Sequence, residues 1–267
     1  EVHPDGRGAG VWVRRSKNVR IDGIVVSQLP IGQCDSVELT NVKSISYYGW
    51  GDGMDVFSSS NVILDGVFCR NSDDCAAVYA STQGFKGGSN NVLVKNATLW
   101  ADVAHPINIG GHGDPNGMDT VQNVTFRNID ILDQAEKQID YQGCLTINPG
   151  DNTLVRNITF ENIRIEDFRN GQLVNFRISF NPKYCVSTGR GIHNVLVKDV
   201  TYNGSGENLS IIAGYDENYK ISGIRFVNLV VNGRKITDDM PGKPKWYKTG
   251  DMAGIFIGEH VENISFE

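Results

Sequence analysis

A short phrase recurs nine times along this chain, and its recurrence limits the architectures that the sequence can adopt. Each copy resembles Asn-Val-x-Ile-x-Asn-Val, with alternating apolar and polar residues and a small turn-forming residue near the middle. The copies begin at Asn18, Ser36, Asn61, Asn91, Asn123, Asn157, Asn194, Gly223 and Asn263. Alternation with a period of two is typical of a strand with one buried face. The repeat therefore predicts one strand per copy, stacked along a common axis.

A second apolar segment lies between consecutive copies. These segments begin at Asp52, Asp74, Pro106, Cys144, Val174, Leu209 and Ala253. Two strands and a turn per coil, with loops of unequal length, explain why the intervals between copies vary from 18 to 40 residues. The pattern predicts an all-β fold, a parallel β-helix of about nine coils. A β-sandwich also has strands at intervals, but it gives no reason for one phrase to recur nine times.

Composition excludes several classes of protein and of partner. The chain has 267 residues, a net charge of −6 and no Lys/Arg block, so we expect neither a nucleic-acid partner nor disorder. No apolar run is long enough for a membrane span, and the first six residues do not read as a signal peptide. The five cysteines lack metal-type spacing and are expected to be buried thiols. No linker divides residues 1–267, which predicts a single domain, and we expect a monomer.

Three carboxylates come together when the second strands of neighbouring coils are aligned. The segment Asp52-Gly53-Met54-Asp55 then lies beside Asp74-Cys75-Ala76-Ala77, which places Asp52 next to Asp74, with Asp73 one residue away. Carboxylates this close cannot all ionise cheaply, so at least one pKa should rise. A protonated carboxyl beside a carboxylate is the arrangement that glycoside hydrolysis requires.

Further polar residues are predicted along the same stripe of the rod. His112, between two glycines one coil further on, is expected to reach the acids, whereas His3, His105, His193 and His260 are interpreted as structural. Arg177 interrupts an apolar run and Tyr215 follows another, so both are candidates for binding a sugar. Trp50 and Tyr184 are the two aromatic residues most suited to stack on a sugar ring. Together these residues predict a cleft for an extended polymer.

The ordered series Asp52-Gly-Met-Asp, Asp73-Asp74-Cys, Gly-His112-Gly, Arg177-Ile and Tyr215 resembles glycoside hydrolase family 28, the polygalacturonase-like enzymes. The resemblance covers nearly the whole chain. It implies a right-handed parallel β-helix and an inverting hydrolase of pectin-like or other plant or algal glycans, extracellular or periplasmic, without metal or other cofactor. It also implies that Asp73 is the general acid, that Asp52 and Asp74 activate the water, and that His112 tunes the acid. Arg177 and Tyr215 would then bind the sugar.

The sequence departs from the family pattern at two places. Trp50-Gly51 replaces Asn-Thr before the first Asp, and Ser179 replaces the Lys of Arg-Ile-Lys. Without that ammonium a uronate loses one binding partner, so the sugar, its linkage and endo or exo action stay open. Two other functions are considered: a calcium-dependent β-helical polysaccharide lyase and a non-catalytic glycan-binding β-helix. The family's usual length leaves open whether further coils precede Glu1.

Overall fold

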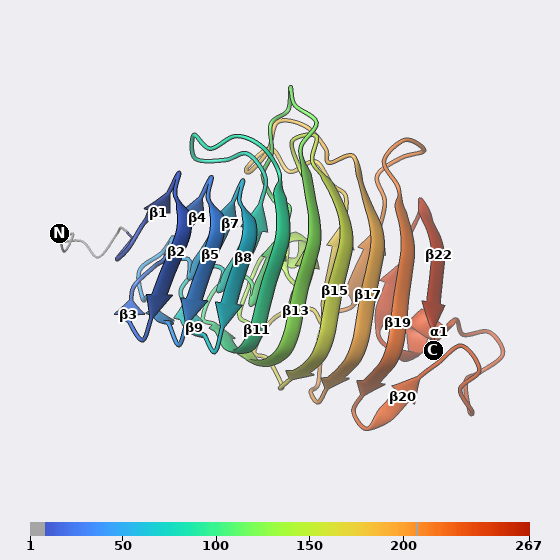
Figure 1. The fold of residues 1–267 in the computed structure, drawn as a ribbon. Helices are drawn as coiled ribbons and strands as arrows, with labels where there is room; N and C mark the ends of the chain where they lie inside the picture. The colour runs from blue at the N-terminus through green and yellow to red at the C-terminus, as the bar shows by residue number, and fades with distance from the viewer. Residues whose placement is uncertain (1–8, 207) are drawn as a thin grey trace.

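The structure, a computed structural model, describes residues 9–206 and 208–267 as a right-handed parallel β-helix (Figure 1). Residues 1–8 of the predicted domain lie outside the described residues. They include His3 and the segment that was compared with a signal peptide. The predicted all-β class and parallel stacking are confirmed. No helix in the described ranges is long and apolar enough to cross a membrane.

One sheet of nine parallel strands is formed by the second strands of the coils. Its strands are, in spatial order, β1 (Val13–Arg14), β4 (Ile31–Gly32), β7 (Met54–Phe57), β10 (Ala76–Tyr79), β12 (Ile107–Ile109), β14 (Leu145–Ile147), β16 (Val174–Arg177), β18 (Ser210–Ala213) and β21 (Ile255–Ile257). Each step along this order corresponds to one coil of the helix. Neighbouring strands of the sheet lie about 4.8 Å apart.

The repeated phrase forms the other sheet, which faces the viewer in Figure 1. Its main strands are β2 (Lys17–Asp22), β5 (Asp35–Thr40), β8 (Ser60–Asp65), β11 (Ser89–Ala101), β13 (Thr120–Asp133), β15 (Leu154–Ile165), β17 (Gly191–Tyr202), β19 (Ile221–Val231) and β22 (Val261–Phe266). Three shorter strands continue this sheet: β3 (Val25–Val26), β6 (Lys43–Ile45) and β9 (Phe68–Asn71). β3 pairs with β6, β6 pairs with β9, and β9 pairs with the second half of β11. The remaining elements are β20 (Arg234–Ile236), η1 (Ile139–Tyr141) and α1 (Thr249–Met252).

A residue with a left-handed backbone bends the strand near the middle of the repeated phrase, and in three successive coils this residue is asparagine. Asn96, Asn128 and Asn162 adopt φ angles of 53°, 55° and 54°, a left-handed conformation that Asn tolerates better than most residues. Their side chains form a ladder, since the amide of Asn128 donates to Asn96 at 2.7 Å and the amide of Asn162 donates to Asn128 at 3.3 Å. The repeated Asn thus provides both the bend and a hydrogen bond between coils.

The interior of the rod is a column of stacked apolar side chains. Phe126 lies against Phe160 at a ring-centroid distance of 5.9 Å, and Phe160 lies against Phe176 at 5.9 Å. All five cysteines are free and buried, as expected from the sequence.

Phe160→Ala is expected to lower the free energy of unfolding by about 3–5 kcal/mol, because it opens a cavity between two fully buried rings. Chemical denaturation measures this loss. Phe256→Ala, at a side chain that is 55% exposed on β21, is the control and should cost far less. Equal losses in the two variants would show that the column is not the stabilising core.

Candidate active site

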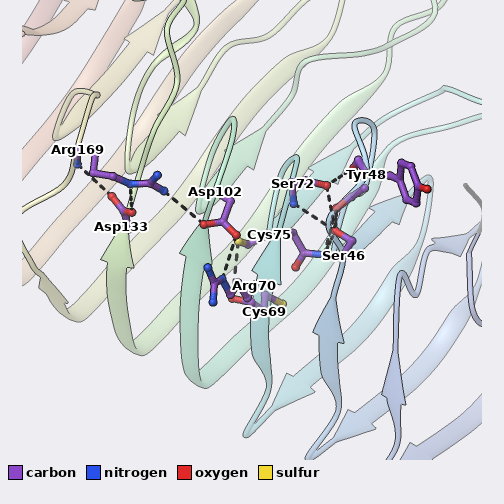
Figure 2. Close-up of polar contacts among 11 residues, drawn as sticks. Ser46, Tyr48, Cys69, Arg70, Ser72, Cys75, Asp102, Asp133 and Arg169 are labelled. Atoms are coloured by element: carbon purple, nitrogen blue, oxygen red, sulfur yellow. Dashed lines mark hydrogen bonds and ion pairs between the residues drawn. The ribbon is translucent and has the colours of Figure 1, made fainter. Parts of the chain in front are cut away.

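The loop between β6 and β7 carries the first acid and is fixed by buried hydrogen bonds. The amide of Asn71 donates to Ser46 Oγ at 3.0 Å and to the carbonyl oxygens of Gly51 at 3.1 Å and Asp52 at 3.2 Å. Ser72 donates to the carbonyl oxygen of Tyr48 (Figure 2). These contacts hold the backbone at Asp52 against the following coil.

Ion pairs between coils support the neighbouring loops (Figure 2). Asp102 accepts from Arg70 Nε at 3.0 Å and lies 3.4 Å from Arg169 Nη2, and Arg169 also pairs with Asp133. Each of these pairs is partly exposed and contributes little stability alone. These ion pairs connect two loops that carry residues of the cavity described below. Asp102 directly precedes Val103, and Asp133 lies three residues before Glu136.

The three predicted acids converge. Met54 pairs with Ala76 in the ladder between β7 and β10, and the amide of Gly53 donates to the carbonyl oxygen of Asp74 at 2.7 Å. This register places Asp52 opposite Asp74. One carboxylate oxygen from each of Asp52, Asp73 and Asp74 lies within 4.8 Å of the other two.

Asp74 is the fixed member of this cluster. Its Oδ1 lies 2.7 Å from His105 Nδ1 and accepts from the His105 backbone amide at 3.1 Å. Its Oδ2 accepts from the Tyr79 hydroxyl and from the Asn108 amide, both at 2.7 Å. Each oxygen therefore has two partners, and the carboxylate has no free lone pair in its plane.

The environment separates the pKa values of the three acids. Burial, followed by repulsion from Asp74, raises the pKa of Asp52 to about 7. Burial and the charges of Asp74 and Asp52 raise the pKa of Asp73 to about 8. Burial opposes ionisation of Asp74 as well, but His105 and the hydrogen bonds from His105, Tyr79 and Asn108 outweigh it and lower the pKa. Near neutral pH the cluster thus holds a protonated Asp73 beside an ionised Asp74.

His105, rather than His112, is the histidine that contacts the acids within the described ranges. His105 is fully buried and hydrogen-bonded to Asp74, whereas the ring of His112 packs edge-on against Tyr79 at 5.0 Å. Burial lowers the pKa of His112, which lines the cavity. The strand register explains this contact: Ala76 pairs with Ile107, and Asp74 and His105 each lie two residues before these partners. Alignment of the second strands in the sequence could therefore have identified His105. We therefore assign to His105 the contact that the sequence suggested for His112.

The acids open into a cavity of about 620 Å³. Its wall includes the predicted Trp50 and Tyr184 and two further residues, Tyr47 and Tyr141. The ring of Tyr141 lies 4.8 Å from that of Tyr184 and contacts His105 edge-on at 4.3 Å. Trp50 is 69% exposed, which leaves its ring free to stack on a ligand.

Arg177 and Tyr215 are not among the residues that line this cavity. Arg177 ends β16, three coils beyond β10 and therefore roughly 14 Å along the axis at about 4.8 Å per coil. Tyr215 follows β18, one coil further, and is 48% exposed. The structure does not bring these two side chains to the acids.

Asp55 is a member of the site that the sequence analysis did not include among the candidate residues. It lies on β7, is 5% exposed and lines the cavity, and its Oδ1 has no hydrogen-bond partner among the described residues. Burial, with the charges of Asp52, Asp74 and Asp73, raises its pKa well above the usual range. Asp55 therefore adds a fourth carboxyl, held neutral, to the cavity.

Tyr79→Phe is expected to lower kcat about 10–100-fold if the cluster is catalytic, because Asp74 loses a hydrogen bond to a charged oxygen. The ring remains stacked on Phe57, so KM should change little, while the lost hydrogen bond to the buried carboxylate should cost about 1–3 kcal/mol of stability. Steady-state kinetics with a polysaccharide substrate measure the effect. An unchanged kcat would mean that the hydroxyl does not position Asp74.

Comparison with known proteins identifies related sequences and folds. The family model described as "Glycosyl hydrolases family 28" matches residues 11–238. A polygalacturonase of Juniperus ashei is 27% identical over 209 residues, which cover 74% of this chain and 37% of that protein. A probable endo-xylogalacturonan hydrolase A of Neosartorya fischeri is 29% identical over 167 residues, which cover 61% of this chain and 38% of that protein. The chain thus spans less than half the length of these relatives.

A solved structure has the same fold. The family 28 exopolygalacturonase of Yersinia enterocolitica superposes with a TM-score of 0.65 at 15% sequence identity, over 93% of this chain and 46% of that one. At this identity the match concerns the fold alone.

Proposed function

Because the chain belongs to glycosyl hydrolase family 28, we propose that its acid cluster hydrolyses glycosidic bonds in a polysaccharide, with inversion at the anomeric carbon. The observation that carries the proposal is the convergence of Asp52, Asp73 and Asp74 within 4.8 Å of one another at the cavity, where burial and mutual repulsion raise the pKa of Asp73 to about 8 and that of Asp52 to about 7. Protonation of the leaving oxygen and deprotonation of water both require such a pair. Because polymeric substrates lie outside the cell, an extracellular or periplasmic location fits the proposal.

Each acid has a separate role in this proposal. Asp73 donates its proton to the glycosidic oxygen as the bond breaks. Asp52, whose carboxylate makes no side-chain hydrogen bond within the described residues, takes a proton from the attacking water. Asp74 holds a fixed negative charge beside both, which favours the developing positive charge on the sugar.

The spacing of the acids bears on the stereochemistry. Oxygens within 4.8 Å are closer than the roughly 6.5–9.5 Å typical of inverting pairs. We nevertheless propose inversion, which membership of the family implies, because both oxygens of Asp74 are engaged and Asp52 is assigned to the attacking water rather than to the anomeric carbon. NMR of the first anomer released decides between the two outcomes, and inversion is the expected one.

The pH dependence follows from the two raised pKa values. Activity should fall at alkaline pH as Asp73, with a pKa of about 8, loses the proton it must donate. It should also fall at acid pH as Asp52, with a pKa of about 7, takes up a proton and cannot act as base. A profile of kcat/KM against pH measures both limbs. Full activity at pH 10 would contradict the role of Asp73.

Two alternatives predict different results. A calcium-dependent lyase would lose activity in chelator and release an unsaturated, ultraviolet-absorbing product. The hydrogen bonds to both oxygens of Asp74 leave it poorly placed to bind a cation, which favours the hydrolase. A non-catalytic glycan-binding protein would release no reducing ends. Its affinity for the glycan would not depend on whether Asp73 is protonated.

A further inference from the structure

We propose that the sugar bound at the bond-cleaving position is uncharged, so that the substrate is a neutral polysaccharide rather than a polyuronate. This inference rests on the proposed hydrolase function and names its substrate class. A uronate brings a carboxylate into the cavity, and proteins bind carboxylates with Arg or Lys, most strongly through bidentate Arg. The distribution of charge around the cavity is therefore the relevant observation.

Acidic side chains dominate the wall of the cavity. Asp52, Asp55, Asp73, Asp74 and Glu136 line it, and no arginine of the described chain does. Asp74 is ionised and buried, so its charge acts through a poorly screened medium. A uronate carboxylate would be repelled there, and its approach would also disfavour the ionised Asp52 that the water requires.

Among the described residues Lys183 is the one lysine or arginine that lines the cavity, beside His112, whose pKa is lowered by burial, and Lys183 already has partners. Its Nζ donates to Gln138 Oε1 at 3.0 Å and lies 4.7 Å from the centre of the Tyr184 ring. The side chain is exposed and joins two loops across the cavity rim. One ammonium on the exposed rim does not place a cation beside the buried charge of Asp74.

The strands nearest the acids, β7 to β14, also supply no cation on their outward face. Asp55, Ala77, Asn108, Thr146 and Asn175 occupy one outward row, because the ladder pairs each with the next. In the neighbouring row the first cation is Arg177, on β16.

The wall instead offers aromatic surface. Tyr47 is 81% exposed, and its ring lies 4.5 Å from that of Tyr48; with Trp50 it forms the apolar rim of the cavity. Aromatic rings contact the C–H faces of a sugar without requiring it to be charged.

Galacturonan in two forms isolates the effect of charge, since the methyl-esterified polymer is neutral and the de-esterified polymer is anionic on the same backbone. Reducing ends are measured on both, and on arabinan, galactan, xyloglucan and α- and β-glucans. At least one neutral polymer should be hydrolysed, with kcat/KM at least about tenfold higher than for de-esterified galacturonan. The highest activity on the de-esterified polymer would overturn the inference. The neutral polymer that is cleaved best identifies the sugar.

Binding to Asp73→Asn tests charge independently of turnover. Affinity electrophoresis should show weaker binding of de-esterified than of methyl-esterified galacturonan, and added salt should reduce that difference by screening repulsion. Tighter binding of the anionic polymer, weakened by salt and abolished in Lys183→Gln, would overturn the inference. If no polymer releases reducing ends, the proposed function fails, while this binding comparison still decides whether the cavity rejects charge.

Discussion

Asp73→Asn is expected to lower kcat by about 10³-fold, because Asn fills the same volume but has no proton of suitable acidity to donate. The loss should appear on any polysaccharide that the native protein cleaves, with little change in KM. Reducing-end release measures it. Asp199→Asn, at the half-exposed bend of β17 where other coils carry Asn, is the matched control and should leave kcat unchanged. Native activity in Asp73→Asn would remove Asp73 from the mechanism.

The same variant should be more stable than the native protein at high pH. The folded-state pKa of Asp73, about 8, exceeds the usual value of about 4 for the unfolded chain, so stability falls as pH rises between these values. Asn removes this penalty. We expect Asp73→Asn to raise the free energy of unfolding by about 1–3 kcal/mol at pH 9 and by almost nothing at pH 3. Destabilisation at pH 9 would instead make Asp73 a structural residue.

Asp74→Asn should abolish activity, again by about 10³-fold or more, and in addition destabilise the fold. The side-chain NH2 of Asn would face either His105 or the donors Tyr79 and Asn108, whichever way the amide is turned. A buried donor without an acceptor should cost about 2–4 kcal/mol.

Thermal and chemical denaturation of the two variants therefore separate their roles. Asp73→Asn should lose activity alone, and Asp74→Asn should lose activity and stability together. Equal stability of the two variants would show that the hydrogen bonds to Asp74 are not required for folding.

Periodicity allowed the fold to be predicted because each coil repeats the same requirement. Alternating apolar residues define the strand face, and the recurring Asn marks the bend, as at Asn96 and Asn128. The same register brought Asp52 beside Asp74, since equivalent residues of stacked strands share a face.

The remainder of the site depends on information that the local pattern does not contain. Gly-His112-Gly stands out as a motif, but His112 lies beyond the end of β12, whereas His105 lies in register with Asp74. Arg177 is separated from the acids by three coils, a distance that motif order does not reveal. Glu136 and Tyr141 reach the cavity from the connection between β13 and β14, which contains the short helix η1 and which no strand register can position.

The central claim is that one carboxyl of the cluster keeps its proton near neutral pH while its neighbour is ionised. NMR titration of protein labelled with 13C at the Asp carboxyl carbons measures this directly. A carboxyl resonance should titrate near pH 8 in the native protein and be missing from Asp73→Asn, with Asp74 remaining ionised down to acid pH. Titration of every Asp resonance below pH 5 would contradict the account.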